Sequence, residues 1–538
     1  MRYKIALDLG TSGERAQALD ERGNVISTAI TLRHPLPGAN IMDQLHFTIE
    51  NGFDVSPALI NQTVNKLLSS LQIDLNKVDT IAACGNPIQI SLFEGIEIRD
   101  LAYAGDNMLK KLKINVPNRN AKVIEAGELN LNVNSKAEVI IPPTVRHEIG
   151  ADALAMLMRS GILDEEGISL VTDYGTNAEM SLVFEGEIYT GSAASGPAIE
   201  GQHIKCGMLA SPGAICDVDT DWRNYVLNGK LEKKAGQIVN PKTGEIIDDS
   251  DIISKGITGT GVIAAIAVGI EKGLINPPQI LTPDKKLRLQ GGAYFKEKDL
   301  IEALTATAAI AAGHRTLFEE AGVNINELKS VYMAGATGTY VDPLKAQKVN
   351  LIPPVMDKVV QVGNTSLSMA IELVKDINVL DEMQQFADSL RSKHIMFAKS
   401  ETFKFSFVSE LGLWTEGMPR DAYNKYLIQY GLQQVPEIKK PKKIVRKAKS
   451  DIPDLGNKGL TTVANIGVKL IGIFEGCTSC LKCVKECPEN ALTEVEDKER
   501  KRLVILSELC NGTACKRCEK VCPNKVFKFN DLTLEALC

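Results

Sequence analysis

The sequence predicts an α/β protein of several domains that ends in a small, cysteine-rich α+β domain. The chain has 538 residues, which is more than a single hydrophobic core usually supports. Strand-like and helix-like stretches alternate up to about residue 435, as in sheets covered by helices. Eight of the twelve cysteines lie between Cys477 and Cys522, which marks a separate module.

Composition excludes several classes of protein. A hydrophobic fraction of 44% and a charged fraction of 24% are typical of a folded globular chain. The net charge of −6 gives no global attraction for nucleic acid, so we expect no nucleic-acid partner. The start of the chain has no apolar signal region, and the most apolar segment, 256–273, is interrupted by glycines. We therefore expect a cytoplasmic protein without membrane contact.

The order of the patterns predicts four regions. Strand-like runs include IALDLG, VDTIAAC, ISLVTDYG and KSVYMAGATG, and residues 302–320 have the pattern of a buried, alanine-rich helix. Within residues 439–449, seven of eleven residues are basic, which indicates a solvated linker or, alternatively, a docking site for an acidic partner. We expect a first lobe over 1–145, a second over 146–435, a basic linker over 436–465 and the cysteine domain over 466–538.

The cysteine domain contains two similar clusters. The first is Cys477-x2-Cys480-x2-Cys483-x3-Cys487-Pro, and the second is Cys510-x4-Cys515-x2-Cys518-x3-Cys522-Pro. Three close thiolates and a remote fourth suit a [4Fe–4S] cluster, whereas a zinc ribbon, the alternative, has two separated Cys-x2-Cys pairs. The sequence therefore predicts two [4Fe–4S] clusters.

In two-cluster domains of this kind, the fourth cysteine of each run ligates the other cluster. The predicted ligand sets are Cys477, Cys480, Cys483 and Cys522 for one cluster, and Cys510, Cys515, Cys518 and Cys487 for the other. The second run has two additional residues, and Asn511 and Gly512 in it are expected to form a turn. The remaining cysteines are Cys84, Cys206 and Cys216, expected to be small buried residues, and Cys538 near the end.

The start of the chain has the features of a phosphate-binding turn. A strand ends at Asp8, and Gly10, Thr11 and Ser12 follow it. Glycine lets backbone N–H groups approach phosphate, the two hydroxyls can donate hydrogen bonds, and the carboxylate can meet Mg²⁺. A single turn of this type is common, so the prediction depends on its recurrence.

The pattern recurs twice. Asp173 is followed by Gly175, Thr176 and Asn177 between two strand-like runs, so two hairpins could hold the phosphates of one nucleotide. After another strand come Gly335 and Gly338, where a helix start could approach adenosine. Gly259 and Gly261 form a further glycine element, expected near the base or ribose. The chain lacks the G-x4-G-K-[ST] motif of P-loop kinases.

In this order, the three elements resemble the phosphate 1, phosphate 2 and adenosine motifs of the actin, sugar kinase and Hsp70 superfamily. The resemblance covers residues 1 to about 435 and implies two RNase H-like lobes that bind ATP and Mg²⁺. It also implies that Asp8 and Asp173, the carboxylates of the two phosphate motifs, are the candidate catalytic residues of ATP hydrolysis.

The whole chain resembles the reductive activators of corrinoid proteins, in particular those that serve methylamine methyltransferases in methanogenic archaea. The segments that carry the resemblance are RHPLPGANIMDQLHF, HEIGADALA, YGTNAEM and MAGATGTYVDP. The resemblance implies ATP-dependent, one-electron reduction of Co(II) to Co(I) on a separate corrinoid protein, with electrons from an upstream low-potential donor. Because the chain has no D-x-H-x-x-G motif, we expect the corrinoid to arrive on its partner.

Two other functions fit parts of the sequence. Activators of radical dehydratases use the same ATPase superfamily, but they resemble a shorter chain with one cluster shared by two subunits. A chaperone-like binding module with structural clusters is the alternative from a different class, and its clusters would not cycle at low potential.

Overall fold

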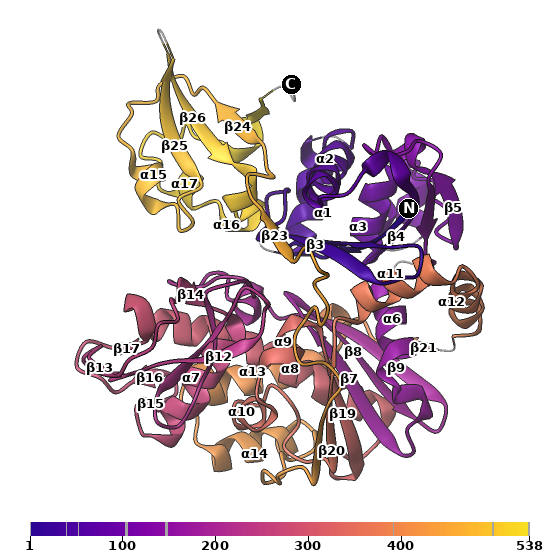
Figure 1. Cartoon of the computed structure of the whole chain (residues 1–538). Helices are drawn as coiled ribbons and strands as arrows, with labels where there is room; N and C mark the ends of the chain where they lie inside the picture. The colour runs from indigo at the N-terminus through magenta and orange to yellow at the C-terminus, as the bar shows by residue number, and fades with distance from the viewer. Residues whose placement is uncertain are drawn as a thin grey trace. The chain divides into compact units, whose positions relative to one another are not determined.

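The structure is a computed structural model that describes residues 2–535 except 39, 52, 103–105, 146–148, 391 and 498–499. The chain forms two compact units (Figure 1). Unit 1 comprises Met1–Asp152, Met369–Asp388 and Leu455–Cys538, and unit 2 comprises Ala153–Ser368 and Ser389–Asp454. In the described part of the chain, no helix has both the length and the apolar character needed to cross a membrane.

Unit 1 is built on a seven-stranded sheet with helices packed beside it. The strands, in spatial order, are β23 (Leu460–Val463), β3 (Val25–Thr31), β2 (Glu14–Leu19), β1 (Tyr3–Leu9), β4 (Val78–Gly85), β6 (Glu138–Ile141) and β5 (Lys122–Glu125). The helices are α1 (Ile41–Asn51), α2 (Val55–Ser70), α3 (Pro87–Glu94), α4 (Arg99–Ala102), α5 (Asp106–Leu112) and α12 (Asn378–Ser389). Residues of β1, β2 and β4 pack with α2 and α3 in one buried hydrophobic core.

The cysteine domain belongs to unit 1 and has its own four-stranded sheet. Its strands are β25 (Leu492–Asp497), β26 (Arg500–Leu506), β24 (Lys469–Gly472) and β27 (Thr533–Leu534), in that spatial order. Three short helices carry or follow the cysteines: α15 (Lys482–Glu486), α16 (Gly512–Cys515) and α17 (Arg517–Lys520). Leu470, Leu492, Ile505 and Phe527 are buried in this domain.

Unit 2 has a second seven-stranded sheet and a smaller five-stranded one. The large sheet is ordered β21 (Ser392–His394), β9 (Glu187–Ala194), β8 (Asn177–Phe184), β7 (Ile168–Tyr174), β19 (Leu328–Ala334), β20 (Lys358–Gly363) and β22 (Lys443–Arg446). The small sheet is ordered β13 (Ile246–Asp248), β12 (Lys233–Val239), β11 (Arg223–Leu227), β10 (Ala214–Val218) and β14 (Gly256–Ile257). Two short hairpins pair β15 (Ile275–Asn276) with β16 (Gln279–Ile280), and β17 (Lys286–Arg288) with β18 (Tyr294–Lys296).

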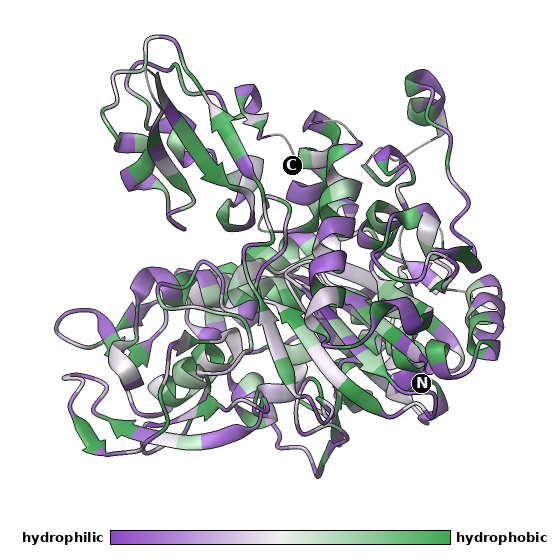
Figure 2. Ribbon diagram, turned by 45° about the horizontal axis from the view of Figure 1, so that its top comes forward, coloured by the Kyte–Doolittle hydropathy of each residue, from purple (hydrophilic) through white to green (hydrophobic). Residues whose placement is uncertain are grey.

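The helices of unit 2 are α7 (Gly259–Glu271), α8 (Glu297–Ala321), α9 (Gly335–Tyr340), α10 (Pro343–Lys348), α13 (Glu401–Thr415) and α14 (Arg420–Gln429). Helices α6 (Ala151–Ser160) and α11 (Thr365–Lys375) contain two of the points at which the chain passes from one unit to the other; the others lie at the end of α12 and after β22. The predicted alanine-rich helix is confirmed as α8, which is buried over most of its length. Figure 2 shows hydrophobic residues gathered along the strands of the central sheets.

The two large sheets share one topology. In each, three consecutive antiparallel strands (β1–β3 and β7–β9) are followed across the sheet by a strand parallel to the first, β4 or β19. Parallel strands covered by helices read as nearly continuous apolar runs, which is why IALDL and ISLVT are recognisable in sequence. The predicted pair of RNase H-like lobes followed by an α+β cysteine domain is confirmed.

Residues 436–465 do not form the solvated linker that the sequence predicts, because they contain two strands. The basic part of this segment forms β22, which pairs in parallel with β20, and its end forms β23, which pairs in parallel with β3. The segment is therefore the edge strand of two sheets rather than a free linker. Since edge strands tolerate lysine, the basic run reads like a solvated tether in sequence. Cys84 and Cys216 are buried as expected, Cys206 is half-buried, and Cys538 lies outside the described residues.

Candidate nucleotide turns and cluster cavities

The first predicted phosphate turn connects β1 to β2 in unit 1. Asp8, the last residue but one of β1, is almost fully buried, and its Oδ2 lies 3.1 Å from Nη1 of Arg15, its cross-strand neighbour. A Cβ on Gly10 would lie 2.7 Å from the carbonyl oxygen of Gly13. Only glycine fits there without a shift of the backbone, so the tight turn predicted from the motif has a steric reason.

Two helices hold this turn in place. The side chain of Gln44 on α1 donates a hydrogen bond from Nε2 to the Thr11 carbonyl, at 2.9 Å. Asn86 donates from Nδ2 to the Thr11 hydroxyl at 3.2 Å, and its Oδ1 accepts the first N–H groups of α3. Ser12 lies in the same turn, half-buried. These hydrogen bonds therefore hold the turn in its shape without a bound ligand.

Glu14, the residue after the turn, was not selected from the sequence. Its carboxyl group is 1% exposed, and neither oxygen has a hydrogen-bond partner in the described chain. Burial, with the charge of Asp8 as a second cause, raises its pKa to about 8. A glutamate beside a polar turn normally reads as solvent-exposed, and only the pairing of Glu14 opposite the core residue Leu9 could have indicated burial.

The second predicted turn connects β7 to β8 in unit 2, with Asp173 near its start. The N–H and the hydroxyl of Thr176 both donate to the Glu200 carboxylate. The hydroxyl of Ser195 donates to the carbonyl oxygens of Gly175, at 2.8 Å, and of Thr176, at 3.0 Å. Glu200 and Ser195 were not predicted, because they support the turn from a distant part of the chain.

The third element lies beside Asp173 at the same edge of the sheet. β19 pairs in parallel with β7, so that Ala334 is opposite Asp173 and Gly335 begins α9 directly after it. Gly335 has φ +74°, and a Cβ there would collide with the carboxylate of Asp173. Gly338 lets α9 pack on β19, since a Cβ would lie 2.8 Å from the carbonyl carbon of Met333. The structure thus brings the second and third elements together.

Gly259 and Gly261 lie at the start of α7, both buried. A Cβ on Gly259 would overlap the carbonyl group of Ile199, and one on Gly261 would overlap that of Ile215. The hydroxyl of Thr258 caps the helix by accepting the N–H of Gly261 at 3.1 Å. Close packing is therefore a sufficient reason for these two glycines, whose role near a base or ribose stays a prediction.

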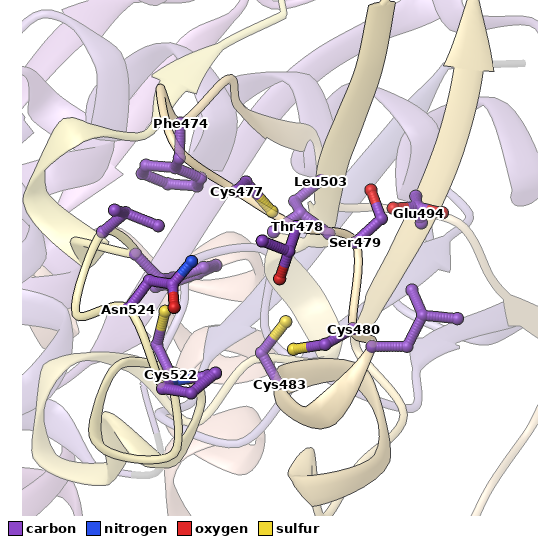
Figure 3. A pocket seen from close by; sticks show the side chains of 14 residues that line it. Phe474, Cys477, Thr478, Ser479, Cys480, Cys483, Glu494, Leu503, Cys522 and Asn524 are labelled. Atoms are coloured by element: carbon purple, nitrogen blue, oxygen red, sulfur yellow. The ribbon is translucent and has the colours of Figure 1, made fainter.

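In the cysteine domain, the first cavity is lined by Cys477, Cys480, Cys483 and Cys522 (Figure 3). The sulfur atoms of the four residues point into it from two separate segments of chain. Phe474, Leu503 and Phe527 supply apolar walls, and Asn524 donates from Nδ2 to the carbonyl oxygen of Gly476 at 3.0 Å. Cys477 and Cys480 are exposed, so this cavity opens at the surface of the domain.

The second cavity is lined by Cys487, Cys510, Cys515 and Cys518, with Ile505, Leu509 and Phe529 as apolar neighbours. Backbone N–H groups donate to two of the sulfurs: Ala491 to Cys487 at 3.2 Å and Gly512 to Cys510 at 3.4 Å. The structure thus groups the cysteines into the two crossed sets that the sequence predicts.

Burial makes some of these thiols hard to ionise. Burial raises the pKa of Cys510 and of Cys518 to about 12, and it also raises that of Cys483. A thiol must lose its proton to bind iron, so loading these sites releases protons. Four cysteines line each cavity, and in the second cavity two backbone N–H groups donate to sulfurs, which fits the requirements of a cubane cluster.

Comparison with known families covers most of the chain. Residues 3–165 match the family described as RACo middle region, and residues 167–424 match the C-terminal domain of RACo, the ASKHA domain. Residues 476–526 match the 4Fe-4S dicluster domain, which includes all eight clustered cysteines.

Individual relatives and one solved structure agree with these matches. The chain is 46% identical to the [Co(II) methylated amine-specific corrinoid protein] reductase of Methanosarcina barkeri over 95% of this chain and 96% of that protein. It is 24% identical to the corrinoid activation enzyme RamQ of Eubacterium limosum, over 66% of this chain and 60% of the relative.

Among solved structures, the reductive activator for corrinoid,iron-sulfur protein superposes with a TM-score of 0.62 at 23% identity. The superposition covers 76% of this chain and 65% of that one. The 46% identity to the corrinoid protein reductase, over nearly the full length of both chains, shows that the chain belongs to the family of reductive activators of corrinoid proteins.

Proposed function

We propose that this protein uses ATP to drive the one-electron reduction of Co(II) to Co(I) in the corrinoid proteins of methylamine methyltransferases. The observation that carries the proposal is the 46% identity, over nearly the full length of both chains, to a reductase specific for such corrinoid proteins. The chain joins an ATPase-type fold to a dicluster domain, which is the combination that an energy-requiring electron transfer needs.

The clusters are assigned to the eight cysteines. Cys477, Cys480, Cys483 and Cys522 would hold one [4Fe–4S] cluster, and Cys487, Cys510, Cys515 and Cys518 would hold the other. When bound, such clusters accept and release single electrons, and an upstream low-potential donor would supply them. The exposed thiols of Cys477 and Cys480 favour the first cavity for electron exchange with other proteins, because all four cysteines of the second cavity are half-buried.

ATP with Mg²⁺ is assigned to the glycine turns. Asp8 and Asp173 would meet Mg²⁺, directly or through water, and the N–H groups and hydroxyls of Thr11, Ser12 and Thr176 would bind phosphate. Gly10, Gly175, Asn177, Gly335 and Gly338 shape these turns, and Gly259 and Gly261 belong to the same proposal. ATP can shift the reduction only if its bound states interact differently with the partner, so the nucleotide acts through conformation.

The test combines the reconstituted protein with a reductant, ATP and a Co(II) corrinoid protein. We expect Co(I) to form, seen optically, only when ATP is present. Asp8→Ala should abolish the ATP-dependent reduction of Co(II) and leave the cluster absorbance unchanged. Asp79→Ala is the control. Asp79 lies near the start of β4, at the opposite end of that strand from Gly85, which pairs with Leu9 beside the turn.

Several outcomes would contradict the proposal. Equal reduction without ATP would remove the role of the nucleotide, and tetrahedral zinc in place of iron would remove the electron carriers. Activation of a radical dehydratase with no reduction of corrinoid would favour the other class of activator. Loss of both cluster absorbance and ATP dependence in Asp8→Ala would make Asp8 a structural residue.

A further inference from the structure

The segment of residues 33–38, here called the strap, leaves β3 and runs along the second cluster cavity within unit 1. Nη2 of Arg33 lies 3.3 Å from Oε2 of Glu489, which lines that cavity beside Cys487. The hydroxyl of Ser507 donates to the carbonyl oxygen of Pro35 at 2.6 Å. The N–H of Gly38 donates to the carbonyl oxygen of Cys510, a proposed cluster ligand, at 2.9 Å.

The closest approach occurs where the second cysteine run departs from the common spacing. A Cβ on Gly512 would lie 3.1 Å from Cα of Gly38, so two glycine backbones are in contact. Gly38 and Gly512 both have positive φ, +136° and +65°, a conformation that suits glycine. The additional residues between Cys510 and Cys515 therefore form the surface against which the strap packs, a role that spacing alone does not reveal.

The other end of the strap is connected to the phosphate turn by a continuous row of side-chain hydrogen bonds. Nε2 of His34 lies 3.0 Å from Oε1 of Gln89. Nε2 of Gln89 donates to Oε1 of Gln44 at 2.7 Å, and Nε2 of Gln44 donates to the Thr11 carbonyl at 2.9 Å. The row therefore ends at the residue whose backbone and hydroxyl form the proposed phosphate site.

The direction of every bond in the row is fixed. Nδ1 of His34 accepts the N–H of Leu36 at 3.2 Å, so the ring proton is on Nε2 and is donated to Gln89. Each amide then donates to the next acceptor in one sense, an arrangement in which neighbouring hydrogen bonds strengthen one another.

Burial makes the row stiff. The side chains of Gln44, Gln89 and His34 are 0%, 1% and 5% exposed, so no water replaces a broken bond. Leaving one buried donor or acceptor unpaired costs about 1–3 kcal/mol. If the Thr11 carbonyl moves, Gln44, Gln89 and His34 therefore move with it, because breaking any one of these bonds would leave a buried polar group unpaired.

We propose that His34, Gln44 and Gln89 are positioning residues that couple nucleotide binding at the Thr11 turn to the cluster held by Cys510, through the strap. This inference rests on the proposed ATP and cluster sites. It assigns the coupling to one cluster only, because among the described residues the strap contacts the surroundings of the second cavity and makes no contact with the first.

Coupling between two sites is reciprocal, which makes it measurable from either side. If nucleotide binds about tenfold more tightly to one redox state of the cluster, the one-electron midpoint potential moves by about 59 mV. We expect a shift of about this size for the Cys510 cluster and none for the Cys477 cluster, which serves as an internal control.

The experiment measures both midpoint potentials by EPR-monitored titration, with and without a non-hydrolysable ATP analogue and Mg²⁺. Loss of one signal in Cys480→Ser identifies the first cluster. Gln89→Leu removes the centre of the row, and Ser507→Ala removes a strap contact at the far end. Gln17→Leu is the matched control, because Gln17 is also a buried glutamine of unit 1, bonded to Thr28 at 2.9 Å and outside the row.

Gln89→Leu and Ser507→Ala should keep the iron content and should bind nucleotide within about threefold of wild type. Both should lose most of the nucleotide-dependent shift in the midpoint potential of the Cys510 cluster, whereas Gln17→Leu should retain this shift. An unchanged shift in both row and strap variants, equal shifts of both clusters, or no shift in the wild type would overturn the inference. Failure of the wild type to bind nucleotide or iron would instead overturn the proposed function, so the two failures are distinguishable. If Gln89→Leu does not fold, Ser507→Ala decides alone.

Discussion

Glu14 is a carboxyl group held in the protein interior without a hydrogen-bond partner among the described residues. Its pKa is raised from 4.5 to about 8 by burial, so the folded state keeps a proton that the unfolded state loses above pH 4.5. The unfolded state therefore binds fewer protons in this range. Stability is at its full value below pH 4.5 and decreases as the pH rises towards 8.

We predict that Glu14→Gln makes the protein insensitive to this effect, since the amide has no proton to lose. Relative to wild type, the variant should gain about 2 kcal/mol in the free energy of unfolding between pH 6 and pH 8. Thermal midpoints at both pH values, with Glu21→Gln as an exposed control from the same hairpin, provide the measurement. A difference from wild type that stays constant with pH would contradict the prediction.

Gly335 provides a second prediction at the residue scale. Alanine there requires an unfavourable φ of +74° and pushes against Asp173, whereas Gly322, with φ +68°, has open space around its missing side chain. Gly322→Ala should cost about 1 kcal/mol of stability, the cost of the backbone alone. Gly335→Ala should cost more and should also weaken ATP binding at least about tenfold, measured by titration calorimetry. Equal effects of both substitutions on stability and binding would show that the contact with Asp173 is unimportant.

Single residues were predictable where chemistry requires one residue type at one spacing. Asp8, Gly10 and Thr11 were selected because the same strand-and-turn pattern recurs later in the chain, and the structure places them at the tight turn between β1 and β2. Glu14, Ser195 and Glu200 were missed, because their roles depend on burial or on contacts across 19 to 24 residues. Nothing in their local sequence distinguishes them from ordinary surface residues.

At the scale of elements, the two cysteine runs exchange their fourth members. Because each cavity takes three cysteines from one run and one from the other, pairs of substitutions distinguish the crossed from the uncrossed arrangement. We predict that Cys480→Ser with Cys522→Ser leaves about four irons per chain of the original eight or so. Cys480→Ser with Cys487→Ser should leave almost none, because it damages both cavities.

Iron analysis and EPR of the two double variants give the answer. The uncrossed arrangement would produce the reverse result, with iron retained in Cys480→Ser with Cys487→Ser. Each single variant should retain about four irons and serves as the control.

Elements were predictable in proportion to how local their cause is. Helix α8 was predicted over 302–320 and spans Glu297–Ala321, because an apolar, alanine-rich period needs no distant partner to be recognised. The strands β22 and β23 were missed inside the expected linker. The basic stretch of β22 and the short apolar and threonine stretch of β23 become strands only because β20 and β3 each have an open edge, and such edges are invisible in the sequence.

For the whole molecule, the boundaries of the units were the least predictable feature. The first lobe was expected to end at residue 145, but unit 1 also takes Met369–Asp388 and the chain from Leu455 onwards. The order of motifs along a sequence shows which lobes exist. It does not show which later segment returns to complete an earlier sheet, because that choice depends on contacts between residues hundreds of positions apart.

We predict a consequence for truncated chains. A chain that ends at Asn465 lacks the cysteine domain but keeps β23, whereas a chain that ends at Asp454 loses both. The shorter chain leaves the edge of β3 uncovered and loses the bond from the N–H of Thr28 to the carbonyl oxygen of Gly459. Its thermal midpoint should be lower by about 5 °C, from differential scanning fluorimetry of the two chains. Equal midpoints would mean that β23 contributes nothing to the stability of unit 1.

The position of β23 also matters while the protein is being made. The strand it covers, β3, is complete at residue 31, but its neighbour leaves the ribosome only after residue 463. At typical translation rates of about 5–20 residues per second, the growing polypeptide presents a bare sheet margin for roughly 20–90 s. Such margins pair readily with other chains, so newborn copies of this protein are prone to pair with one another until β23 has been translated.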